Sequence, residues 1–170
     1  MKILYLPGFS EHNLEAAEQL QKDFAAQGLK VDIIKWEHWR DGTESFKLAA
    51  ESEKVLKAIG SSEAVIIAKS VGTRLIAGVI TGNLALQVKY LVLMGVPSQN
   101  EVYTELFKTF PAERLMIIQN RSDPHGHFAD VARFAHAANP GIKMVQGERS
   151  DHSYPFADII IAELKRHKLV

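Results

Sequence analysis

The stretch IIAKSVGT, residues 66–73, joins an apolar strand-like run to a segment with helical spacing. A serine, Ser70, stands at the corner, with Ala68 two residues before it and Gly72 two residues after it. A tight strand–turn–helix lifts such a hydroxyl clear of the sheet, and small residues are needed because strand and helix approach closely there. The stretch predicts either a nucleophilic serine or a serine that only caps the helix at Thr73.

Short apolar runs alternate with segments of helical spacing along the whole chain. The runs that predict strands are KILYL (2–6), VDIIKW (31–36), EAVIIA (63–68), KYLVLMGV (89–96), RLMIIQN (114–120) and IKMVQ (142–146). Helical spacing occurs at about 14–25, 46–59, 73–81, 101–110, 128–138 and 155–168. This alternation favours one α/β domain over residues 1–170, a three-layer α/β/α sandwich around a six-stranded, mostly parallel sheet.

Hydrophobicity also predicts the order of the strands. Central parallel strands are buried on both faces and read as continuous apolar runs, as AVIIA, YLVLMGV and RLMII do. The second and sixth runs contain more polar residues and suit the edges, which gives the order 2-1-3-4-5-6. In that order a crevice opens at the carboxyl ends of strands 1 and 3. The loops PGFS (7–10) and AKSVGT (68–73) would face each other across it.

A nucleophilic serine on this sheet needs an acid and a histidine in the chain order Ser, Asp, His. The fifth predicted strand runs into RSDPHGHF, which contains Asp123, and the sixth into ERSDHSYP, which contains His152. Both follow carboxyl ends of strands, the edge at which Ser70 lies. Taken singly, Asp123 suits a turn and His152 a surface loop. The three together predict a catalytic triad, with Asp123 rather than the adjacent Asp151 as the partner of His152.

Composition excludes several classes of function. The 170 residues are 46% hydrophobic and 24% charged, with a net charge of zero, so no basic surface for nucleic acid is expected. The chain contains no cysteine, which excludes disulfides and thiolate chemistry and fits a reducing cytoplasm. The N-terminus MKILYLPGFS reads as a strand rather than a signal peptide, and no run is long enough to span a membrane.

The motifs LPGF, AKSVGT, RSDPHG and SDHSY together resemble the α/β-hydrolase superfamily, in particular its small, lidless, dienelactone-hydrolase-like members. The resemblance implies a minimal form of that fold, with strand 1 leading straight into the oxyanion loop. It also implies that the backbone N–H groups of Phe9 and Val71 bind the oxyanion. Many members have His-Gly in that loop, where this chain has Pro7-Gly8.

The expected activity is a serine hydrolase that cleaves a carboxylic ester or related acyl bond of a small molecule, without a cofactor or metal. A hydrolase fold that has lost turnover and only binds a ligand or protein is the alternative. The pair His125 and His127 is a weaker metal hypothesis, because no established zinc motif is present. Trp36 and Trp39, in KWEHWRDG after the second strand and beside the crevice, suit edge packing or a substrate wall. Lys69 is expected to point to solvent, or else to attract acidic substrates.

Overall fold

The sheet of the computed structural model has six parallel strands in the order β2-β1-β3-β4-β5-β6, as predicted. The structure describes residues 1–43, 45–83, 86–97 and 99–170. The strands are β1 (Lys2–Leu6), β2 (Asp32–Ile33), β3 (Ala64–Lys69), β4 (Val88–Met94), β5 (Leu115–Asn120) and β6 (Lys143–Gly147).

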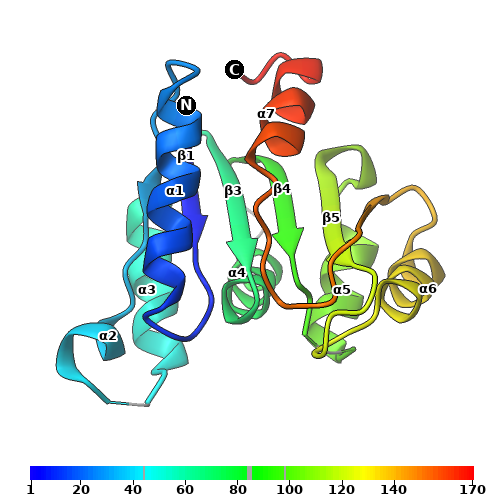
Figure 1. Ribbon diagram of the computed structural model, residues 1–170, viewed down its shortest axis with the longest axis horizontal. Helices are drawn as coiled ribbons and strands as arrows, with labels where there is room; N and C mark the ends of the chain where they lie inside the picture. The colour runs from blue at the N-terminus through cyan, green and yellow to red at the C-terminus, as the bar shows by residue number, and fades with distance from the viewer. Residues whose placement is uncertain (44, 84–85, 98) are drawn as a thin grey trace.

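Helices cover both faces of the sheet, which gives three layers (Figure 1). They are α1 (Asn13–Ala25), α2 (Glu37–Asp41), α3 (Leu48–Ile59), α4 (Val71–Thr81), α5 (Glu101–Thr109), α6 (Phe128–Ala138) and α7 (Ala157–Arg166), with a 3₁₀ turn, η1 (Ala112–Arg114), before β5. Within the described ranges, no helix is long and apolar enough to cross a membrane.

The two faces divide the apolar side chains by the alternation of the strands. In β3, Ile66 and Ala68 join the core beneath α3, α4, α5 and α6, whereas Val65 and Ile67 join the core beneath α1 and α7. Every residue of β3 is buried, as expected for a central parallel strand. Figure 1 shows α1 and α7 in front of the sheet and the other long helices behind it.

The second strand is much shorter than predicted. The apolar run 31–36 forms a strand only at Asp32 and Ile33, which pair with Leu4 and Tyr5 of β1. The chain then turns into the short helix α2, which the sequence did not predict. The side chain of Glu51 in α3 stabilises the start of α2, because its carboxylate accepts a hydrogen bond from the Glu37 N–H at 2.6 Å. This helix lies beside the β1–α1 loop.

All of the loops that carry the predicted site residues lie at the carboxyl ends of the strands. This edge is at the bottom of Figure 1, where the β1–α1 loop, the β3–α4 corner and the loops after β5 and β6 meet. The segment after β4 contains the short helix α5, which packs against the sheet through Tyr103, Leu106 and Phe107, and the turn η1. A parallel sheet therefore gathers residues distant in sequence at one edge.

Candidate active site

Ser70 occupies a strained corner between β3 and α4. Its φ of 53° and ψ of −118° lie outside the regions that residues other than glycine usually adopt. The Ser70 side chain makes no capping hydrogen bond. Instead, the N–H and the hydroxyl of Thr73 both donate to the Ser70 carbonyl oxygen, at 2.9 and 2.6 Å. These two hydrogen bonds stabilise the first turn of α4, and the Ser70 hydroxyl takes no part in capping the helix.

Gly72 is required by a close approach of helix α4 to strand β1. A Cβ atom at this position would lie 2.5 Å from the carbonyl oxygen of Leu6, closer than side chains tolerate. Ala68, the other small residue of the motif, is fully buried and pairs with Leu6 in the sheet. The contact also brings the end of β1, and hence the loop that begins at Pro7, next to the Ser70 corner.

Asp123 and His152 form the second part of the site. The Nδ1 atom of His152 lies 2.6 Å from Oδ2 of Asp123, across the gap between the loops after β5 and β6. A carboxylate can only accept, so Nδ1 carries the proton and the neutral ring keeps Nε2 as an acceptor. Asp151, the neighbour of His152, instead binds Arg149 through both carboxylate oxygens. The hydrogen bond with Arg149 lowers the pKa of Asp151 to about 2.

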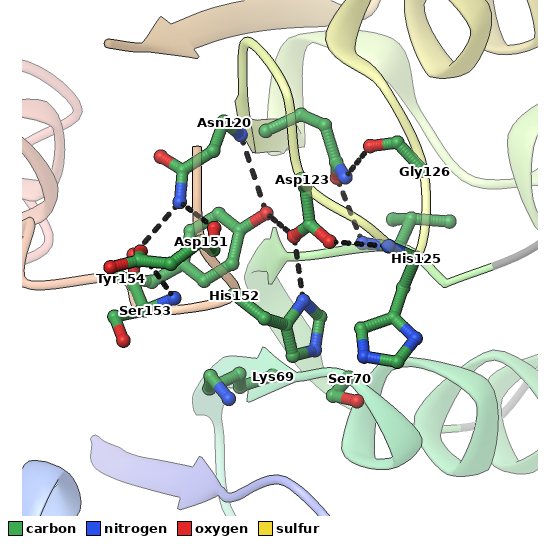
Figure 2. A network of polar contacts seen from close by, with 12 residues as sticks. Lys69, Ser70, Asn120, Asp123, His125, Gly126, Asp151, His152, Ser153 and Tyr154 are labelled. Carbon is green, nitrogen blue, oxygen red and sulfur yellow. Dashed lines mark hydrogen bonds and ion pairs between the residues drawn. The ribbon is translucent and has the colours of Figure 1, made fainter. Parts of the chain in front are cut away.

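The Asp123 carboxylate is fully buried and receives three hydrogen bonds. Besides His152, the Tyr154 hydroxyl donates to Oδ2, and the backbone N–H of His125 donates to Oδ1 at 2.8 Å. Burial and the adjacent carboxylate raise the pKa of Tyr154, so the phenol keeps its proton as a donor. Figure 2 shows the carboxylate at the centre of these contacts. A buried carboxylate needs such donors, and here they orient the Asp123 carboxylate toward the imidazole of His152.

The loop that carries His152 is held by a side chain that the sequence did not single out. The Nδ2 group of Asn120 donates to the carbonyl oxygens of Asp151 and Ser153, both at 2.8 Å, and so clamps the backbone on each side of the histidine. Asn120 is buried at the end of β5. A polar residue that ends an otherwise apolar strand is the sequence signal that could have revealed it.

The remaining ring nitrogen of His152 faces the serine corner. His152 Nε2 is buried and has no hydrogen-bond partner among the described residues. The ring packs on Gly95, where a Cβ atom would lie 2.7 Å from Cε1, and the preceding residue, Met94, accepts the Ser70 N–H at 3.0 Å. Figure 2 shows Ser70 on the Nε2 side of the ring. Apo active sites often leave this hydrogen bond unformed until substrate binds.

Burial lowers the pKa of His152, and this effect exceeds the opposing effect of the hydrogen bond to Asp123. The positive charge of Lys69 lowers the pKa further, and so does His125, whose ring centroid lies 4.6 Å from that of His152. The imidazole is therefore neutral at pH 7 and able to accept a proton through Nε2.

The β1–α1 loop is anchored by ring N–H groups from the region of α2. Trp36 Nε1 donates to the Gly8 carbonyl oxygen at 3.0 Å, and Trp39 Nε1 and His38 Nε2 lie 2.7 Å from the Phe9 carbonyl oxygen. Trp36 is buried, so its indole is a structural anchor rather than a wall open to substrate. Among the described residues, none accepts a hydrogen bond from the Phe9 N–H.

Lys69 does not point to solvent, contrary to the first of the two expectations. The residue is only 6% exposed, and its Nζ donates to Oδ1 of Asn13 at 2.7 Å. The reason is the strand alternation, which directs Lys69 to the same face as Val65 and Ile67, under α1. Burial accordingly lowers the pKa of the Lys69 ammonium.

His125 and His127, the pair of the metal hypothesis, lie in different surroundings. The ring of His125 packs edge-on against His152, whereas His127 is exposed at the N-terminus of α6. In the described ranges, no three histidine, aspartate or glutamate side chains are grouped so that they could hold a metal ion.

Comparison with known proteins gives matches at the level of structure. No protein-family model and no curated protein matches the sequence. The esterase domain of a Rhodothermus marinus protein superimposes with a TM-score of 0.69 at 16% identity, covering 97% of this chain and 86% of that one. An α/β-hydrolase enzyme from a sediment metagenome of the Mar Chica lagoon has a TM-score of 0.72 at 13% identity, covering 98% and 92%.

A third structure is an α/β serine hydrolase without a lid from Xanthomonas campestris, with a TM-score of 0.65 at 14% identity, covering 98% of this chain and 81% of that one. The chain has the α/β-hydrolase fold. Its strand order and its strained serine corner agree with the resemblance seen in the sequence. At these identities the likeness establishes the fold, and the chemistry rests on the site itself.

Proposed function

We propose that the protein is a serine hydrolase that cleaves a carboxylic ester or a related acyl bond. The observation that carries the proposal is the pairing of His152 Nδ1 with the buried Asp123 at 2.6 Å, which leaves Nε2 free on the side of Ser70. This is the arrangement that a serine needs to lose its proton at neutral pH.

The reaction follows from these positions. His152 Nε2 takes the Ser70 hydroxyl proton as Oγ forms a bond to the acyl carbon, and the carbonyl oxygen becomes an oxyanion. His152 then returns the proton to the leaving alcohol as the acyl–oxygen bond breaks. A water molecule repeats the sequence on the acyl-serine, which releases the carboxylic acid and restores Ser70. Asp123 keeps the imidazole in the required tautomer and stabilises the imidazolium.

The N–H groups of Phe9 and Val71 are the proposed oxyanion donors. Val71 is the first residue of α4, so its N–H has no acceptor within the helix. Phe9 follows Gly8, whose carbonyl is bound to Trp36, and the trans peptide directs the Phe9 N–H the opposite way. Val71 follows Ser70 directly, and the loop that carries Phe9 begins beside the Ser70 corner, because the end of β1 packs against Gly72.

Hydrolysis of a short-chain 4-nitrophenyl ester tests the proposal. The wild-type protein should release nitrophenol with saturation kinetics, and Ser70→Ala should reduce the rate at least about a thousandfold while the circular dichroism spectrum is preserved. Equal activity of the two proteins would contradict the assignment of Ser70. A folded wild-type protein without activity on any acyl substrate would favour the alternative, a binding protein that has lost turnover.

A further inference from the structure

We propose that the cavity beside His152 is a subsite for a carboxylate of the substrate, with the Lys69 ammonium as its partner. The inference rests on the proposed hydrolase function and names its substrate class: esters that carry a second, ionised carboxyl group. The supporting observations are the position of the cavity, the burial of Lys69 and the balance of charges around it.

The cavity lies between α1 and the loop after β6 and has a volume of about 330 Å³. Its walls reach from the triad histidine to the start of α1. The polar residues that line it include His12, Asn13, Gln19, Asp23, Lys69, Arg149, His152, Ser153 and Tyr154. The one carboxylate among them, that of Asp23, accepts a hydrogen bond from Gln19 Nε2 at 2.8 Å. Since the cavity touches His152, a molecule attacked by Ser70 can extend a second functional group into it. Figure 2 shows Lys69 and Ser70 on the same side of His152.

The Lys69 ammonium is buried with too few partners. It has three N–H donors, and the side chain of Asn13 accepts one of them at 2.7 Å. In the described part of the chain no carboxylate forms an ion pair with Lys69. Lysine is rarely this buried without an opposite charge, so a bound anion would supply the missing partner.

Among the described residues, Lys69 is the cation of this cavity that has no ion-pair partner, because the Asp123 and Asp151 carboxylates attract it only through space. Arg149, which also lines the cavity, is paired with Asp151. The Asp123 carboxylate is engaged by His152, Tyr154 and the His125 N–H. One cation without an ion pair matches a monoanion such as a carboxylate, whereas a phosphate monoester would bring a second negative charge without a partner. Charge-assisted hydrogen bonds from the ammonium would fix its position.

Asn13 holds the Lys69 ammonium in position. Its Nδ2 donates to the carbonyl oxygen of Ser10 at 2.7 Å, which orients Oδ1 toward Lys69. Gly8 makes room for this side chain, because a Cβ atom there would lie 2.8 Å from Asn13 Oδ1. The same residues therefore hold both the lysine and the loop that carries the proposed Phe9 oxyanion donor.

Matched pairs of esters test the inference on both sides of the scissile bond. The acyl pair is the 4-nitrophenyl half-ester of adipate and its methyl-capped neutral counterpart. The alcohol pair is 4-acetoxybenzoate and its methyl ester. For each pair, kcat/KM is measured with wild type, Lys69→Met, Lys69→Gln and a control, Lys22→Met, which removes an exposed charge from α1. The rate with Ser70→Ala is subtracted as background.

We expect wild type to prefer the anionic member of at least one pair, and the ratio of anionic to neutral kcat/KM to fall about tenfold in both Lys69 variants and to persist in Lys22→Met. Wild-type hydrolysis without an anionic preference, or a ratio unchanged in a folded Lys69 variant, would overturn the carboxylate subsite and leave the hydrolase proposal intact. Absence of all hydrolysis would contradict the hydrolase proposal. Calorimetry with adipate then decides the subsite: binding lost in Lys69→Met supports it, and no wild-type binding overturns it.

Discussion

The indole Nε1 of Trp36 donates a hydrogen bond to the Gly8 carbonyl oxygen at 3.0 Å, although 28 residues separate the two in sequence. This carbonyl belongs to the peptide group whose N–H is that of Phe9. Because a peptide group is planar, the indole sets the direction of the proposed oxyanion donor. Trp39 binds the next carbonyl, that of Phe9, and so acts on a different peptide group.

Replacement of these two tryptophans should therefore have unequal effects. Trp36→Phe should lower kcat for a 4-nitrophenyl ester about tenfold to a hundredfold with little change in KM, because the oxyanion forms only after binding. Trp39→Phe should have a much smaller effect, since His38 still contacts the same carbonyl oxygen. Steady-state kinetics and melting temperatures of both variants check this. Equal losses of kcat, or a change confined to KM, would contradict the role of Trp36.

The two aspartates near His152 should differ by orders of magnitude in their importance. Asp123→Asn should reduce kcat about ten-thousandfold, because the amide no longer holds the imidazole in the required tautomer. Asp151→Asn should change kcat by less than about threefold, since the exposed Asp151 side chain pairs with Arg149 and accepts the Ser153 N–H, a bond that the Asn amide oxygen can still accept. Rate measurements on the two variants at saturating ester provide the comparison. The reverse ranking would show that the wrong carboxylate has been assigned.

The pH dependence should reflect the lowered pKa of His152. Only the neutral imidazole accepts the serine proton, so kcat/KM should rise with pH to a plateau, with a midpoint below the ordinary histidine value of about 6.5. In Lys69→Met the midpoint should move upward, because loss of a nearby positive charge favours the imidazolium. Lys22→Met serves as the control. A midpoint above 6.5 in wild type, or a downward shift in Lys69→Met, would contradict this assignment.

The fold could be predicted because parallel strands differ in burial. The continuous apolar runs of β3, β4 and β5 indicated the centre of the sheet, and the more polar run 142–146, which forms β6, indicated an edge. The short β2 and the helix α2 could not be predicted, because Trp36 is as apolar as a strand residue and its position depends on a hydrogen bond to Gly8.

The site was only partly predictable. The positions of Ser70, Asp123 and His152 after strand ends predicted that the three residues lie at one edge of the sheet. This prediction needs only the parallel topology. The contacts that orient them could not be predicted, because they join distant parts of the chain. Asn120 holds the backbone on both sides of His152, and Tyr154, although it lies in SDHSY, donates to Asp123 across 31 residues. The burial of Lys69 could have been predicted, because side chains alternate along β3 and Lys69 lies on the face that α1 covers.

Covalent labelling of Ser70 is the measurement that tests the central claim most directly. The protein is incubated with a fluorophosphonate, digested and analysed by mass spectrometry, with Ser70→Ala and Asp123→Asn in parallel. An activated serine at the β3–α4 corner should give one adduct on the peptide that contains Ser70, slow labelling in Asp123→Asn and none in Ser70→Ala. A folded wild-type protein that stays unmodified, or an adduct on another residue that persists in Ser70→Ala, would contradict the serine-hydrolase account.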